Sequence, residues 1–210
     1  MSGCRTEQER FWSGDFGDDY IDRNRSSRLA PSNLALFSRI LSRTGPVDSV
    51  LELGANIGLN LDAVTQLLPG VDAAGVEIND RAVRELRARR NIRAFHSSML
   101  EWKPDHEYDL VFTKGVLIHI SPDHLPQVYD LVYGASRRCV LFCEYFNPTL
   151  VEVTYRGHSS KLFKRDFAAD FIDRFADVEV VDYGFVWRRD PAFAQDDMTW
   201  FLLRKVTTAC

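Results

Sequence analysis

An acidic residue and two glycines follow an apolar run in the stretch V-L-E-L-G-A-N-I-G-L-N, residues 50–60. The apolar residues of Val50–Leu53 predict a strand that is covered on both faces of a parallel sheet. Gly54 and Gly58 allow a tight turn at which the backbone comes close to a ligand, and the helix that follows offers free N–H groups. The pattern therefore predicts a ligand-binding turn between a strand and a helix.

A second acidic residue, Glu77, follows the next apolar run, Val71–Val76. In nucleoside-binding sheets an acidic residue about 20 positions beyond the glycine turn accepts hydrogen bonds from the ribose hydroxyl groups. A dinucleotide is the weaker choice of ligand, because Asn56 stands where the pattern G-x-G-x-x-G has its second glycine. A turn that binds no ligand is the remaining alternative.

Length and charge limit the class of protein. With 210 residues the chain fits one compact domain, residues 1–210. Its 26 basic and 30 acidic side chains give a net charge of −4, which argues against a nucleic-acid partner. No apolar run approaches the ~18 residues of a membrane span, and the first residues lack the apolar core of a signal peptide. We therefore expect a cytoplasmic protein without a membrane partner, present as a monomer or a homodimer.

Neither a disulfide nor a metal site is predicted. Cys139 and Cys143 lie in one expected strand, where four residues span about 13 Å, too far for a local disulfide. The chain has no C-x-x-C pair, and Pro122 interrupts any helix that would carry His119 and His124 as paired ligands. We expect the cysteines to be reduced thiols.

Hydrophobic periodicity predicts strands that alternate with helices, which is typical of a doubly wound, seven-stranded and mostly parallel sheet. The last two strands have no helix between them, so they predict an antiparallel C-terminal hairpin. The expected strands are Ser49–Leu53, Ala73–Glu77, Arg93–His96, Tyr108–Thr113, Arg138–Tyr145, Val178–Val186 and Met198–Lys205. The expected helices are Pro31–Arg43, Ile57–Leu67, Asn79–Arg90, Leu125–Gly134 and Arg165–Phe175.

Residues 1–45 precede this core of residues 46–210 and are rich in aromatic side chains. A disordered tail rarely carries so many aromatic residues, so we expect a helical cap across the ligand cleft. Phe11 and Phe16 are expected mainly to pack this cap against the sheet.

Four segments resemble motifs of the Rossmann-like, or class I, S-adenosylmethionine-dependent methyltransferases. Glu52–Gly58 resembles the first motif, (D/E)-x-G-x-G-x-G, and Glu77–Asn79 resembles the ribose-binding second motif. His96–Met99 stands where the adenine-side loop follows the third strand, and Asp109–Ile120 resembles the fourth-strand segment. Because these segments keep the order of that superfamily over 47–120, the resemblance implies a methyltransferase fold.

A narrower resemblance covers nearly the whole chain. Residues 11–24, 142–148, 155–167 and 196–203 look like segments of the methylases associated with pseudaminic acid biosynthesis. The name of that group reflects association with a sugar pathway and does not define a substrate. The resemblance therefore implies a sugar-acid or glycoconjugate precursor, while a natural-product intermediate is equally open.

The resemblance implies S-adenosylmethionine as the cofactor and S-adenosylhomocysteine as its product. In open α/β sheets the ligand lies beyond the carboxyl ends of the strands. The glycines of the turn would admit the methionine part, Glu77 would bind the ribose, and Ile78 and Met99 would sandwich the adenine. The implied cofactor residues are Tyr20, Arg23, Glu52, Gly54, Asn56, Gly58, Glu77, Ile78, Ser98, Met99, Thr113 and Lys114.

Two residues are candidates for moving a proton. His119 follows the fourth strand, and its ordinary pKa near 6.5 suits a general base, although a packing role is equally open. Tyr145 ends the fifth strand on the same edge of the sheet and is the second candidate. A carboxylate acceptor would need no base at all.

A basic segment follows the fifth strand. Its cationic side chains are expected to hold a carboxylate or phosphate of the substrate, with arginine best suited to bidentate contact. A solvated loop is the alternative. The expected substrate residues are Trp12, Tyr155, Arg156, His158 and Lys161. The arginine-rich run 81–93 is instead expected to be an exposed, paired helix face.

The sequence therefore favours a methyltransferase that acts on oxygen or nitrogen of a small, anionic metabolite. An NAD(P)-dependent oxidoreductase is one alternative, disfavoured by Asn56 and by the terminal hairpin. A cofactor-binding module without turnover is the other, because an intact binding motif does not prove chemistry.

Overall fold

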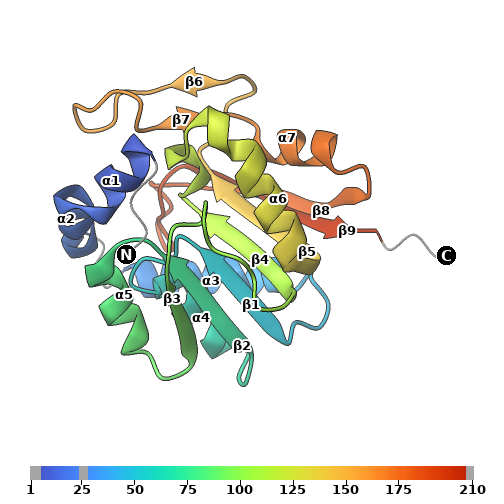
Figure 1. Cartoon of the computed structure of the whole chain (residues 1–210). Helices are drawn as coiled ribbons and strands as arrows, with labels where there is room; N and C mark the ends of the chain where they lie inside the picture. Colours follow the sequence, from blue (N-terminus) through green and yellow to red (C-terminus); the bar gives the residue numbers. More distant parts are fainter. Residues whose placement is uncertain (1–5, 24–27, 207–210) are drawn as a thin grey trace.

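The computed structural model describes residues 6–23 and 28–206, in which seven strands form one sheet with helices on both faces (Figure 1). The strand order is β3-β2-β1-β4-β5-β9-β8. β1 to β5 pair in parallel, whereas β9 runs antiparallel to both β5 and β8. The strands are β1 Ser49–Leu53, β2 Asp72–Glu77, β3 Ile92–His96, β4 Tyr108–Lys114, β5 Ser136–Glu144, β8 Val178–Val186 and β9 Met198–Lys205.

The sheet separates two apolar layers because successive side chains of each strand point to opposite faces. Leu51 and Val111 pack on one face with α6 and α7, and Val50 and Leu110 pack on the other with α3, α4 and α5. Both faces of the central strands are therefore covered, as their near-continuous apolar sequences predict. The helices are α3 Leu29–Leu41, α4 Leu59–Leu67, α5 Asp80–Arg87, α6 Leu125–Ala135 and α7 Phe167–Arg174.

The predicted fold class is confirmed: the mostly parallel sheet ends in the antiparallel hairpin β8–β9. The expected bounds of β1, β8 and β9 agree with the structure. α4, α5 and α7 are shorter than expected, whereas α3 begins and ends two residues earlier and α6 extends one residue further. α4 begins at Leu59 because Gly58 is left-handed (φ +84°) and cannot belong to the helix.

Two short helices, α1 (Glu7–Ser13) and α2 (Asp15–Arg23), form the cap at the carboxyl edge of the sheet (Figure 1). α1 begins with a capping box, in which Thr6 Oγ1 accepts from Glu9 N and Glu9 Oε2 accepts from Thr6 N. Phe11 and Phe16 stack on each other at 4.0 Å, and each also packs on His158. Their packing against the sheet stays a prediction. α3, which the predicted cap 1–45 included, instead packs in the core layer.

The sequence did not predict a small hairpin between β5 and α7. We call residues 151–164 the arm; its strands β6 (Val151–Glu152) and β7 (Phe163–Lys164) pair antiparallel beside α1 (Figure 1). Gln8 Nε2 donates to Ser160 O at 3.0 Å, so the cap and the arm are joined.

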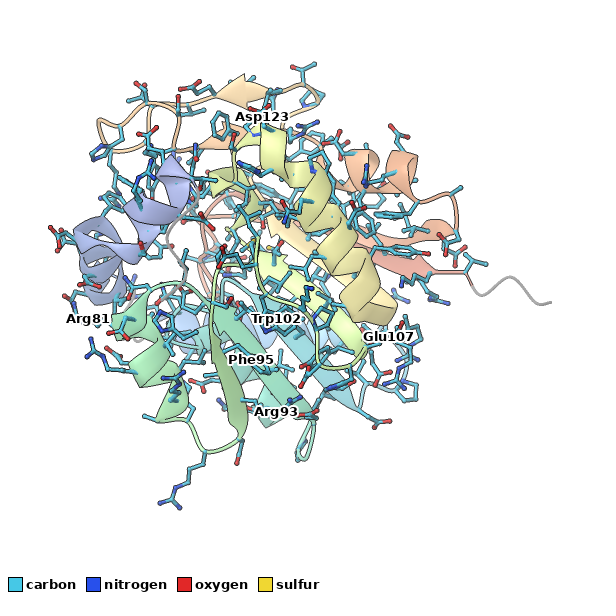
Figure 2. All side chains as sticks on the ribbon, in the orientation of Figure 1. Arg81, Arg93, Phe95, Trp102, Glu107 and Asp123 are labelled. Carbon is cyan, nitrogen blue, oxygen red and sulfur yellow. The ribbon has the colours of Figure 1, made fainter. Side chains whose placement is uncertain are left out.

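Aromatic and charged contacts fix the loops around the carboxyl edge. Phe95 of β3 packs on Trp102 at 5.4 Å, which anchors the loop between them (Figure 2). Arg81 of α5 pairs with Asp22 of α2 at 2.6 Å, on the outer side of the cap (Figure 2).

Cys139 and Cys143 are buried and unbridged, as predicted, while Cys4 and Cys210 lie outside the described residues. Within the described part of the chain, no helix combines the length and apolar character that crossing a membrane requires.

Candidate functional site

A cavity of about 680 Å³ opens at the carboxyl edge of the sheet, beneath the cap. Its walls come from the loops after β1 to β5, from α1 and α2, from the arm and from the β8–β9 loop. It lies within the ~300–1,000 Å³ that small-molecule and cofactor sites occupy.

Most of the residues predicted for the site line this cavity. They are Trp12, Tyr20, Arg23, Gly54, Asn56, Glu77, Ile78, Ser98, Met99, Lys114, His119, Tyr145, Tyr155 and Arg156. Those that do not line it are Glu52, Gly58, Thr113, His158 and Lys161.

Glu77 ends β2 with its carboxylate fixed by backbone donors. Oε2 accepts from Asn56 N at 2.8 Å, and Oε1 accepts from Ile78 N at 2.8 Å and Asn79 N at 2.7 Å. Burial raises the pKa of Glu77, and these hydrogen bonds oppose that shift. Because a carboxylate has about four acceptor positions, one remains for a ligand.

The loop after β1 is held in left-handed conformations. Gly54 (φ +76°), Asn56 (φ +48°) and Gly58 (φ +84°) alternate with residues of negative φ. Asparagine tolerates this region better than most side chains, and Asn56 Oδ1 also accepts from Ile57 N at 2.7 Å. The departure from glycine at position 56 therefore preserves the turn.

Glu52 lies behind this loop, fully buried in β1. Oε1 accepts from Asn60 Nδ2 at 2.7 Å, whereas Oε2 has no hydrogen-bond partner among the described residues. Burial raises the pKa of Glu52 to about 8, so the side chain holds a proton at neutral pH.

Glu144, at the end of β5, was not among the residues predicted for the site. Its carboxylate accepts from Thr113 Oγ1 at 2.8 Å, from Val116 N at 3.0 Å and from Leu117 N at 3.2 Å. It thereby fixes the turn after β4 and the short 3₁₀ helix η1 (Leu117–His119), which a second one, η2 (Pro122–His124), follows. Burial raises the pKa of Glu144 to about 7.

His119 ends η1, and its ring is oriented by the arm. Nδ1 lies 2.6 Å from Lys161 O. A carbonyl oxygen only accepts, so Nδ1 carries the proton and Nε2 is left as the basic nitrogen. Burial lowers the pKa of His119 to about 4, which keeps the ring neutral. Trp12 and Tyr155 lie 4.5 Å and 5.0 Å from it, ring to ring.

Tyr145 donates its hydroxyl hydrogen to Asp196 Oδ2 at 3.0 Å. Burial and the negative charge of Asp196 raise the pKa of Tyr145, so the phenol stays protonated. The geometry therefore favours a hydrogen-bonding role for Tyr145 over proton abstraction.

The arm separates the predicted cationic residues from one another. Arg156 (φ +51°) and Gly157 (φ +86°) form a tight turn between Tyr155 and His158, and Arg156 reaches the cavity. Lys161 Nζ instead pairs with Glu7 Oε1 at 2.5 Å, and His158 packs on Phe11 and Phe16. Only Arg156 of the three predicted cations therefore remains at the cavity.

Residues 50–138 match a family model described as a methyltransferase domain. That segment contains the loop after β1, Glu77 and η1, while the cap, the arm and the hairpin lie outside it. No curated protein matches the chain.

Solved structures extend the likeness to the whole chain. Magnesium protoporphyrin IX methyltransferase from Synechocystis is 10% identical, with 97% of this chain and 100% of that chain covered at a TM-score of 0.68. The chain has the class I methyltransferase fold. Within that fold it is also similar to 1,6-didemethyltoxoflavin-N1-methyltransferase from Burkholderia thailandensis, at 17% identity, 98% and 93% coverage and a TM-score of 0.69. Mitomycin 7-O-methyltransferase is 12% identical, with 96% of this chain and 61% of that chain covered at a TM-score of 0.69.

The buried acid of this methyltransferase fold gives a pH-dependent prediction. Between pH 4.5 and about 8 the unfolded chain loses the Glu52 proton while the folded chain keeps it. The free energy of unfolding therefore falls as pH rises through this window. Glu52→Gln mimics the protonated acid, so its stability relative to wild type should rise from about pH 5 to about pH 8 by roughly 3 kcal/mol.

Urea denaturation at both pH values measures this difference. Glu179→Gln, which changes an exposed carboxylate on β8, serves as the control and should show no such rise. An equal pH dependence for wild type and Glu52→Gln would show that Glu52 is ionised in the folded protein.

Proposed function

We propose that the protein is an S-adenosylmethionine-dependent methyltransferase that acts on oxygen or nitrogen of a small, anionic metabolite. The observation that carries the proposal is the backbone-fixed carboxylate of Glu77 at a cavity beside a left-handed glycine loop. Both features lie within the segment that matches the methyltransferase-domain model. Similar folds hold S-adenosylmethionine or S-adenosylhomocysteine in their solved structures.

The cavity residues fit such a cofactor in order along the sheet edge. The loop Gly54–Gly58 and Lys114 would hold the methionine part, and Glu77 would accept from a ribose hydroxyl. Ile78 and Met99 would enclose the adenine. The bound cofactor supplies a methyl group on a sulfonium, which is already a good leaving group.

Other residues of the cavity would position the methyl acceptor and take its proton. An in-line displacement needs the acceptor held at near-attack distance in a site that excludes water. The rings of Trp12 and Tyr155 beside His119 supply such an enclosed wall. The basic Nε2 of His119 would orient an acceptor hydroxyl or amine and take its proton as the new bond to the methyl carbon forms. The pKa of about 4 makes His119 a weak base, which suits an acceptor whose acidity rises during transfer.

Arg156 supports an anionic acceptor. A non-glycine residue at positive φ costs of order 1 kcal/mol, so the arginine at this turn calls for an explanation. No carboxylate among the described residues pairs with Arg156, whose side chain lies over Tyr155 at 5.9 Å. We infer that its role is to bind a carboxylate or phosphate of the substrate, which fits a sugar acid, a glycoconjugate precursor or a natural-product intermediate.

The proposed enzyme is biosynthetic and cytoplasmic, a single domain that is a monomer or a homodimer, with no nucleic-acid partner. An oxidoreductase is not favoured, because the matched domain and the similar folds are those of methyltransferases. The other alternative, a cofactor-binding module without turnover, would bind the cofactor but transfer no methyl group.

The proposal is tested first by calorimetric titration with S-adenosylhomocysteine and, in parallel, NAD. We expect micromolar affinity for the thioether and none for NAD. Glu77→Ala removes the ribose acceptor and should weaken thioether binding at least about tenfold, whereas Glu179→Ala should not. NAD binding alone would contradict the proposal. Transfer of a labelled methyl group to a panel of carboxylates then separates an enzyme from a binding module.

The anion site is tested with Arg156→Asn. Asparagine suits the left-handed turn, so the melting temperature should stay equal or rise while the guanidinium is lost. For an acceptor found in the labelled-methyl screen, KM should rise at least about tenfold with unchanged cofactor affinity. Arg156→Lys keeps the positive charge but lacks the bidentate guanidinium, so its KM should lie between those of wild type and Arg156→Asn. An unchanged KM in Arg156→Asn would exclude the anion site.

A further inference from the structure

Three carboxylates from the described residues line the cavity, and one of them has no role in the proposed reaction. Glu77 is fixed at the ribose position, and Asp196 accepts from Tyr145 at the acceptor end. Glu9 of α1 is the third, and it is only 8% exposed. A buried carboxylate is costly unless donors surround it, so its position calls for a physical account.

The carboxylate of Glu9 is held at the loop after β3. Oε2 accepts from Thr6 N at 2.8 Å, and Oε1 accepts from the hydroxyl of Ser98. Ser98 Oγ in turn accepts from Leu100 N at 3.0 Å. These bonds place a negative charge from the cap at the end of the cavity where Ile78 and Met99 would enclose the adenine.

The loop itself offers no comparable acceptor. Its cavity-lining residues are Ser97, Ser98, Met99 and Leu100, and none carries a charge. The Ser97 hydroxyl donates to Ser98 O, and the Ser98 hydroxyl is committed to Glu9. Among the described side chains, an amino group that enters this end of the cavity therefore meets Glu9 as its charged acceptor.

We propose that Glu9 accepts a hydrogen bond from the exocyclic amino group of the adenine, so that the cap distinguishes the base. The inference rests on the proposed function. A carboxylate oxygen accepts more than one hydrogen bond, so Oε1 keeps its contact with Ser98 while it binds the amine. Hydrogen bonds to a charged acceptor are about twice as strong as neutral ones, which makes this contact selective.

The contact also links the two ends of the cavity. α1 carries Glu9 at the adenine end and Trp12 beside His119 at the acceptor end, while Glu7 pairs with Lys161 of the arm. Cofactor bound to Glu9 therefore holds in place the helix that forms a wall of the acceptor site.

The test compares S-adenosylhomocysteine with S-inosylhomocysteine, in which an oxygen replaces the exocyclic amino group. By calorimetry, wild type should prefer the adenosyl compound at least about tenfold. In Glu9→Gln the amide oxygen still accepts from Thr6 N, and the amide N–H₂ faces the base. This variant should lose affinity for the adenosyl compound and keep or gain affinity for the inosyl compound. The ratio of the two affinities should therefore fall to about one or below.

Glu7→Gln is the matched control, because it weakens the cap–arm pair on the same helix and lies away from the base. Its affinity ratio should equal that of wild type. An unchanged ratio in a folded Glu9→Gln overturns the inference and leaves the proposed function standing. Wild type that binds neither compound overturns the proposed function itself.

Glu9→Asp is the second variant in case Glu9→Gln does not fold. It keeps the charge but withdraws it from the loop by one methylene group, so the ratio should fall partway. A wild-type ratio in Glu9→Asp overturns the inference.

Discussion

The Glu77 carboxylate is the constraint on which the site depends, because backbone donors from two loops converge on it. Asn56 N comes from the left-handed loop after β1, and Ile78 N and Asn79 N come from the turn into α5. Burial disfavours the charged carboxylate, so these donors and the acid stabilise each other. Asn79 extends the link, because its side chain caps α5 and donates to Trp12 O at 3.2 Å and Asp18 Oδ1 at 2.9 Å. The cap is thus attached to the same point as the loop after β1.

A second buried acid, Glu144, fixes the turn after β4 in the same way. This turn carries η1 and His119. Lys161 of the arm then fixes the tautomer of His119 through its carbonyl oxygen, while its ammonium group pairs with Glu7 of the cap. The loop after β1, the cap, the arm and His119 Nε2 therefore form one connected framework around the cavity.

The parts of this framework that could be predicted from the sequence are those that depend on the spacing of residues close together in the chain. The glycine turn and Glu77 are read from short patterns, and the hairpin β8–β9 follows from two strands without an intervening helix. The arm was missed because its two-residue strands, Val151–Glu152 and Phe163–Lys164, are too short to show a period. The pairing of Lys161 with Glu7 joins residues 154 positions apart, which no local pattern records. Glu144 could be placed at a strand end, but its donors become visible only when β4 and β5 lie side by side.

The crystal structure of the protein with S-adenosylhomocysteine tests the central claim most directly. The account predicts a ribose hydroxyl oxygen about 2.7 Å from the Glu77 carboxylate, the adenine between Ile78 and Met99, and the thioether sulfur directed toward Trp12 and His119. A ribose bound away from Glu77, with the carboxylate still occupied only by Asn56, Ile78 and Asn79, would contradict the claim that this acid organises the cofactor site.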